Sequence, residues 1–217
     1  MKNTLIDGKK MAQKCLEKIK KNIAIYLSAG LRAPKLGTIL IGNNKISQIY
    51  IERKEKEARN AGINTEHFQL NDDCCQEELL NLILELNSNK DIDGILIQQP
   101  LPNYINLKKI FLSLSPKKDV EGMHPENYGK LLYDSPYFIP CTPKSCLRLI
   151  DETNVKLRGS RVVIVGDSVI AGRPLAFLLM NKDATVTVCN EYTKNLAKIT
   201  SQTEILLSAT GIAHLNR

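Results

Sequence analysis

The stretch VVIVGDSVIAGRPLAFLL (162–179) contains the spacing that most directly suggests ligand chemistry. An apolar run ends at Gly166, and Gly172 follows before Pro174 opens a second apolar stretch. This pattern predicts a strand, a tight turn and a helix whose N-terminal N–H groups can hold a pyrophosphate. Ser168 adds a possible hydroxyl donor. The spacing is not GxGxxG, so an ordinary strand-to-helix turn is the alternative.

Two acids bear on which dinucleotide this turn could take. Asp167 lies in the turn, and Glu191 follows the next apolar run. An acid in the second position can hydrogen-bond the ribose diol of NAD, and acids there would repel the 2′-phosphate of NADP. The two residues therefore favour NAD, unless both are solvated loop acids.

A second candidate group lies in the charged segment YIERKEKEAR (50–59). Tyr50 and Lys54 are four positions apart and share one face of a predicted helix. Positive neighbours and partial burial would suit Lys54 to acid–base catalysis, and the Tyr50 ring could stack on a flat substrate. A solvated, salt-bridged helix face is the competing interpretation.

A third group follows the buried run DGILIQQP (93–100). Open α/β sheets bind ligands beyond the carboxyl ends of their strands, where Gln98 and Gln99 would lie. A glutamine can hold a polar heterocycle by two hydrogen bonds. Asp119 and Glu121 come in the next loop, and each could be a turn acid or a ligand contact.

The elements that must position these residues alternate between helix and strand. Helices are predicted over 8–28, 46–60, 76–87, 146–153, 172–182 and 193–201. Strands are predicted over 35–42, 63–70, 93–100, 161–166, 184–190 and 204–210. This alternation predicts parallel βαβ units and an α/β fold.

Residues 100–143 interrupt the alternation with a segment rich in Pro, Gly and Asp, typical of a functional loop or a domain link. We therefore predict two α/β domains, 1–140 and 141–217. The sequence ends soon after the third strand of its second half, where a dinucleotide fold normally continues. We expect the second, Rossmann-like domain to be incomplete at its C-terminus.

Composition restricts the classes of function open to these 217 residues. The N-terminus lacks the apolar core of a signal peptide, and no stretch predicts a membrane span. The formal charge is +7, but lysines alternate with acids and aromatic residues are few. We expect a cytoplasmic protein that binds neither membrane nor nucleic acid. The charge would equally suit an anionic small molecule.

The six cysteines and three histidines do not form a metal-binding pattern. No CxxC pair occurs, and His67, His124 and His214 are far apart, so no metal site is predicted. We expect the cysteines to be thiols in a reducing compartment.

Taken in order, several stretches resemble the bifunctional methylenetetrahydrofolate dehydrogenase/methenyltetrahydrofolate cyclohydrolase family. The resemblance runs from IDGKKMA to ATG, essentially the whole chain, and its collinearity makes it specific. The matching stretches are IGNNKISQIYIERKEKEARNAGI, DGILIQQPLP, PKKDVEGMHPENYGKL, PCTPKS and VGDSVIAGRPLAFLL with ATVTVC.

The resemblance implies two α/β domains with the active-site cleft between them, and a homodimer formed through the cofactor domain. It implies oxidation of 5,10-methylenetetrahydrofolate with NAD(P), usually NADP, to the methenyl form. Hydrolysis to 10-formyltetrahydrofolate then follows.

Roles for individual residues follow from the same resemblance. Lys54 matches the catalytic lysine, Tyr50 the stacking tyrosine, and Gln98 the glutamine that orients the lysine and the substrate. Glu121 stands at the acid that grips the pterin, with Pro100 and Gly122 also at substrate positions. The implied cofactor positions are Gly166, Asp167, Ser168, Gly172, Pro174, Glu191, Thr210 and Gly211.

The chain departs from the family pattern near the cofactor. Gly166-Asp167-Ser168 replaces the usual Gly-Arg-Ser, and Cys189-Asn190-Glu191 replaces Cys-His-Ser. The arginine and the last serine normally meet the 2′-phosphate of NADP. In the substrate region, Glu121 replaces an aspartate. Two alternative functions therefore stay open, a cyclohydrolase without dehydrogenase activity and a non-catalytic paralogue.

Overall fold

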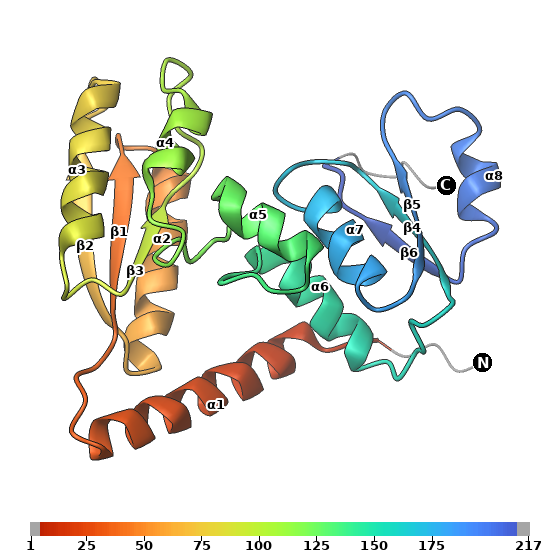
Figure 1. The fold of residues 1–217 in the computed structure, drawn as a ribbon, viewed down its shortest axis with the longest axis horizontal. Coiled ribbons are helices and arrows are strands. Elements are labelled where there is room, and N and C mark those ends of the chain that lie inside the picture. The colour runs from red at the N-terminus through yellow and green to blue at the C-terminus, as the bar shows by residue number, and fades with distance from the viewer. Residues whose placement is uncertain (1–4, 212–217) are drawn as a thin grey trace. The chain divides into compact units, whose positions relative to one another are not determined.

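The computed structural model describes residues 5–211. The chain divides into two compact units, Met1–Val120 and Glu121–Arg217, and each contains a three-stranded parallel sheet with helices (Figure 1). The predicted α/β class with two domains is confirmed. The two compact units meet between Val120 and Glu121, and the domain bounds 1–140 and 141–217 stay a prediction.

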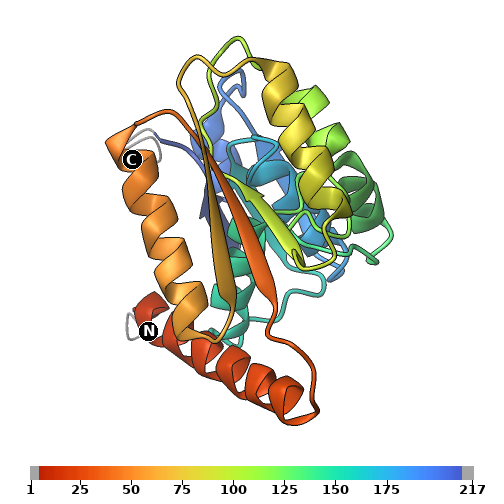
Figure 2. The same ribbon diagram turned by 90° about the vertical axis from the view of Figure 1, so that its left-hand side faces the viewer.

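The first unit orders its strands β2-β1-β3, all parallel. Helices α2 and α3 lie on opposite faces of this sheet (Figure 2). The elements are α1 (Gly8–Ser28), β1 (Lys35–Ile41), α2 (Lys45–Asn60), β2 (Asn64–Leu70), α3 (Gln76–Ser88), β3 (Gly94–Ile97) and α4 (Leu107–Ser113).

The core of the first unit consists of aliphatic side chains from these layers. Ile39 of β1, Ile51 of α2 and Leu79 of α3 are at most 1% exposed. Each such side chain contributes about 1.5–3 kcal/mol by leaving water.

The second unit orders its strands β5-β4-β6, again all parallel. One hydrophobic cluster includes Ile164, Leu175 and Leu179, and a smaller one includes Val163 and Cys189. The elements are α5 (Pro125–Leu132), α6 (Cys141–Asp151), β4 (Arg161–Val165), α7 (Gly172–Met180), β5 (Thr185–Cys189), α8 (Leu196–Thr200) and β6 (Ile205–Ser208).

The segment predicted as irregular, 100–143, contains two complete short helices, α4 and α5, and the start of α6. Side-chain caps explain them. The Asn106 side chain caps α4 by accepting a hydrogen bond from the N–H of Lys109. The His124 ring caps α5 by accepting one from the N–H of Glu126, and Pro125 occupies the first position of that helix. The prediction of irregular structure was therefore wrong for these residues.

None of the helices within residues 5–211 is long and apolar enough to span a bilayer.

Candidate active site

Lys54 and Gln98 come from separate elements and meet at the carboxyl end of β3. The Lys54 Nζ donates a hydrogen bond to Gln98 Oε1 at 3.2 Å. Gln98 is 8% exposed, and its Nε2 donates to the carbonyl of Gln99 at 2.6 Å. Its backbone N–H donates to the carbonyl of Ile39 in β1. Gln98 is thus fixed at both ends, and it fixes the direction of the lysine.

Helix α2 carries Tyr50 one turn before Lys54. Asn44 caps the start of the helix, and its side chain accepts hydrogen bonds from the N–H groups of Ile46 and Ser47. Tyr50 is 56% exposed and Lys54 is half-buried. This exposed ring can stack on a flat substrate beside the lysine.

The other side of α2 is held by Glu55, which sequence reasoning missed. Glu55 Oε1 accepts a hydrogen bond from Thr38 Oγ1 at 2.5 Å and lies 2.9 Å from His67 Nδ1. Burial would raise the pKa of Glu55, but the hydrogen bonds from Thr38 and His67 outweigh it and lower the pKa below its ordinary value. The three residues fix α2 on the sheet, and with it Lys54.

The remaining candidates near this part of the first unit differ in accessibility. Pro100 is exposed and follows a cis peptide bond with Gln99. Asp119 is 1% exposed, and its backbone forms a parallel bridge with Ile95 of β3. Burial and pairing at the sheet edge give Asp119 a structural place in the first unit.

Glu121 and Gly122 belong to the second unit. Glu121 is partly buried. Gly122 is buried with φ +67°, and a Cβ there would lie 2.9 Å from the Pro140 nitrogen and 3.0 Å from the Phe138 carbonyl oxygen. Only glycine fits this turn without strain.

A cavity of about 650 Å³ lies at the carboxyl ends of β4, β5 and β6. It occupies the position at which open α/β sheets bind ligands. The lining residues are Val165, Gly166, Asp167, Ser168, Asn190, Glu191, Tyr192, Thr193, Leu196, Ala209 and Thr210.

Two glycines shape the turn beside this cavity. Gly166 has φ +110°, and a Cβ on it would lie 2.6 Å from the Ala209 carbonyl oxygen. A Cβ on Gly172 would lie 1.8 Å from the Gly166 carbonyl oxygen. Side chains at these positions would disrupt the turn, which brings the N-terminus of α7 close to the end of β4.

Most predicted cofactor residues line this cavity, but three do not. Gly172 supports the turn from behind, and Pro174 is buried in the first turn of α7. Gly211 is exposed and follows Thr210, which lines the cavity. The Ser168 hydroxyl accepts a hydrogen bond from the N–H of Ala171.

Several residues that line the cavity have no role predicted from the sequence. Asn190, Tyr192 and Thr193 form the loop after β5, and Leu196 begins α8. Their position directly after a predicted strand could have indicated this role, because the carboxyl ends of parallel strands meet at the edge of the sheet where ligands bind.

Among residues 5–211 there is no group of three metal-ligating side chains, and His214 lies outside that range.

Comparison with known proteins identifies the family. The model of the tetrahydrofolate dehydrogenase/cyclohydrolase catalytic domain matches residues 6–121, and that of the corresponding NAD(P)-binding domain matches residues 140–217. The chain belongs to the tetrahydrofolate dehydrogenase/cyclohydrolase family. The bifunctional protein FolD of Aquifex aeolicus is 44% identical over 212 residues, which cover 97% of this chain and 73% of that protein.

Solved structures of the tetrahydrofolate dehydrogenase/cyclohydrolase family agree with this assignment. The bifunctional FolD enzyme of Campylobacter jejuni is 39% identical with a TM-score of 0.94, covering 98% of this chain and 75% of that one. The Trypanosoma brucei enzyme, solved with NADP cofactor and an inhibitor, is 33% identical with a TM-score of 0.91, covering 96% and 72%.

Proposed function

We propose that this chain oxidises 5,10-methylenetetrahydrofolate to 5,10-methenyltetrahydrofolate with NAD(P) and hydrolyses the product to 10-formyltetrahydrofolate. One observation carries the proposal. In a member of this family, Lys54 and Gln98 form a 3.2 Å hydrogen bond at a strand's carboxyl end, with Tyr50 on the same helix.

The second unit supplies a place for the dinucleotide. The cavity beside Gly166 is bordered by a strand-to-helix turn into which a Cβ would not fit, and the N-terminus of α7 follows this turn. These features fit a pyrophosphate. When bound, the dinucleotide supplies the hydride acceptor for the oxidation.

Lys54 is the group proposed to move protons in the hydrolytic step. Water adds to the methenyl carbon, a carbon–nitrogen bond opens, and one proton is released. A lysine whose Nζ is held by Gln98 is positioned to transfer that proton. Tyr50 holds the ring system of the substrate by stacking.

Further substrate contacts are proposed at Pro100, Glu121 and Gly122, because the resemblance places the folate against these positions. Glu121 grips the pterin in this proposal. The side chain of a glutamate is one methylene longer than that of the usual aspartate, so its carboxylate lies about one bond length further out. A displacement of this size is large enough to change the rate of catalysis.

We further propose a cytoplasmic homodimer. The spacing of the six cysteines predicts thiols in a reducing compartment, which agrees with this location. The resemblance to dimeric family members supports the oligomeric state.

The experiment compares Lys54→Ala with Lys56→Ala, an exposed lysine of the same helix. Cyclohydrolase turnover of methenyltetrahydrofolate is followed by loss of its absorbance. Lys54→Ala is expected to lose turnover by at least about 100-fold with an unchanged circular dichroism spectrum. Lys56→Ala is expected to retain it. Full turnover in Lys54→Ala would exclude the proposed role.

A further inference from the structure

We propose that the cavity of the second unit selects NAD over NADP, and that Asp167 and Glu191 determine this specificity. The inference rests on the proposed function, because it concerns the cofactor of the same dehydrogenase. It is narrower than the family assignment, which specifies NAD(P) without distinguishing the two dinucleotides.

The charges around the cavity carry the inference. Of the described residues that line it, two are acids and none is Lys, Arg or His. NADP differs from NAD by a 2′-phosphate on the adenosine ribose, which needs cationic or neutral donors. Two carboxylates beside that group repel it and leave it without a counterion.

Glu191 is an exposed acid in a loop that hydrogen bonds hold in place. The loop that presents it is fixed on both sides: Asn190 donates its N–H to Thr193 Oγ1 at 2.8 Å, and Asn190 Oδ1 accepts from the N–H of Tyr192 at 3.1 Å. Within residues 5–211 no cation pairs with the Glu191 carboxylate. A ribose 2′,3′-diol offers the two O–H donors that this carboxylate can accept.

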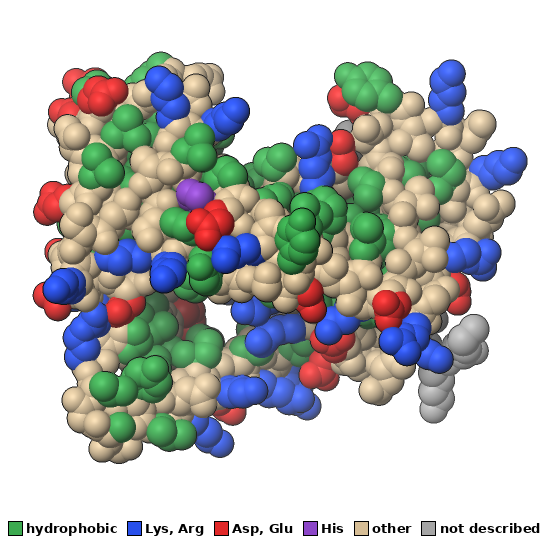
Figure 3. All heavy atoms as spheres, viewed as in Figure 1, with side chains coloured by type: hydrophobic (Ala, Val, Ile, Leu, Met, Phe, Trp, Pro, Cys, Tyr) green, Lys and Arg blue, Asp and Glu red, His purple; other side chains and the backbone are tan. Residues whose placement is uncertain are grey.

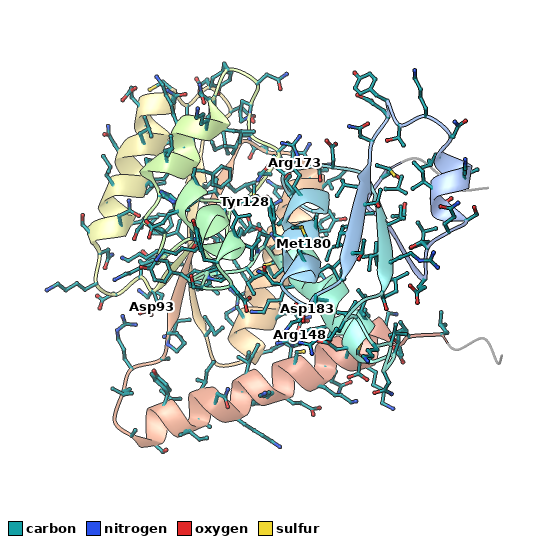
Figure 4. The ribbon with its side chains drawn as sticks, turned by 45° about the vertical axis from the view of Figure 1, so that its right-hand side comes forward. Asp93, Tyr128, Arg148, Arg173, Met180 and Asp183 are labelled. Carbon is teal, nitrogen blue, oxygen red and sulfur yellow. The ribbon has the colours of Figure 1, made fainter. Side chains whose placement is uncertain are left out.

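Asp167 has one cationic neighbour, Arg173 in the first turn of α7. Its Nη2 lies 3.3 Å from Asp167 Oδ2, and both side chains are more than a third exposed. Arg173 does not line the cavity. Burial raises the pKa of Tyr128 of α5 to about 12, and the charge of Arg173 opposes that rise; both side chains are labelled in Figure 4. A competing arrangement would let Arg173 leave Asp167 and bind a 2′-phosphate, in which case NADP would bind more tightly.

Titration calorimetry on the full chain, without folate, separates these arrangements. The probes are NAD, NADP, 5′-AMP and 2′-phosphoadenosine 5′-phosphate. We expect NAD to bind at least about 10-fold more tightly than NADP, and 5′-AMP more tightly than its 2′-phosphorylated form. Equal or tighter binding of NADP would overturn the inference and leave the proposed dehydrogenase intact. If neither dinucleotide binds, both the NAD preference and the proposed dehydrogenase activity are overturned. The proposed cyclohydrolase activity is tested by its own turnover assay.

Variants test the two acids directly. Asp167→Ser with Glu191→Ser is expected to raise NADP affinity by about 10-fold or more and to reduce the NAD preference. Asp151→Ser, which removes an exposed acid at the end of α6, is the matched control and is expected to leave the preference unchanged. If the double variant does not fold, Glu191→Ser in the exposed loop gives the same comparison. An unchanged ratio of NAD to NADP affinities in a folded variant would refute the role of these acids.

Discussion

A single atom of Gln98, its Oε1, accepts the hydrogen bond that orients the Lys54 side chain. Removing the amide leaves the lysine on its helix but no longer holds its Nζ in one direction. We predict that Gln98→Ala lowers cyclohydrolase kcat by about 10–100-fold, since small misplacements of a catalytic group have effects of this size. Steady-state kinetics on methenyltetrahydrofolate measure it.

The control for this prediction is Gln99→Ala. Gln99 contributes its backbone carbonyl to Gln98, which the substitution preserves. Equal losses in the two variants would mean that the local backbone, and not the Gln98 amide, supports Lys54.

Glu55 is a buried acid whose pKa is lowered by its hydrogen bonds with Thr38 and His67. A carboxyl group with a folded-state pKa below the unfolded value adds stability that is present above the unfolded pKa. That stability is lost as pH falls through the folded pKa. We predict that Glu55→Gln lowers the free energy of unfolding at pH 7 by about 1–3 kcal/mol.

Urea unfolding at pH 7 and near pH 4 measures this contribution. The difference between wild type and Glu55→Gln should shrink at the lower pH, because the wild-type carboxylate is then increasingly protonated. Glu52→Gln, on the exposed side of α2, should show little effect at either pH. A difference for Glu55→Gln that is independent of pH would contradict the account.

The turn between β4 and α7 acts at the scale of an element. A Cβ on Gly166 meets both an unfavourable φ of +110° and the Ala209 carbonyl oxygen at 2.6 Å. Gly159 has φ +78° but open space around its Cβ position. We predict that Gly166→Ala destabilises the protein by more than about 1 kcal/mol and weakens dinucleotide binding, because the turn must shift.

Gly159→Ala is the control, because it introduces an unfavourable φ without a clash between the new Cβ and its neighbours. It should leave the affinity for the dinucleotide unchanged. Thermal unfolding with calorimetric titration of NAD measures both effects. Equal affinity in wild type and Gly166→Ala would show that the turn does not shape the binding site.

Elements with strong periodicity were predictable from the sequence, and short capped ones were not. The helix over 8–28 and the alternation around β4 and α7 follow from repeated apolar positions. Helices α4 and α5 have seven and eight residues, too few for a periodic pattern to appear. Their caps at Asn106 and His124 are the signals that were overlooked.

The candidate site was predictable only in part, for a related reason. Tyr50 and Lys54 share a helix face by spacing, so one element suffices to bring them together. The pairing of Lys54 with Gln98 needs the parallel sheet, and the Glu55 network needs three elements. The resemblance supplied the Lys54 and Gln98 roles, whereas nothing in spacing alone pointed to Glu55.

At the scale of the whole molecule, both units expose hydrophobic side chains, and two of these places bear on assembly. Val188 of the edge strand β5 is 41% exposed in the second unit. The first unit exposes Ile25, Tyr26 and Leu27 near the end of α1, where Figure 3 shows hydrophobic side chains gathered at the surface. Exposed apolar surface and open sheet edges favour association.

We predict that the chain is a homodimer and that the surface around Val188 contributes to it. Val188→Glu should weaken dimerisation by about 10-fold or more, because a charge would enter the interface. Leu27→Glu, on α1, should leave it unchanged. Sedimentation equilibrium measures the dissociation constants, and a larger effect of Leu27→Glu would assign the interface to the first unit instead.

The most direct test of the account is one assay on the unmodified chain. It supplies 5,10-methylenetetrahydrofolate with NAD or with NADP, and then methenyltetrahydrofolate alone, while absorbance follows the methenyl form. The account predicts methenyl formation with faster turnover on NAD, and hydrolysis of the supplied methenyltetrahydrofolate. Failure of both oxidation and hydrolysis in a folded protein would contradict its central claim.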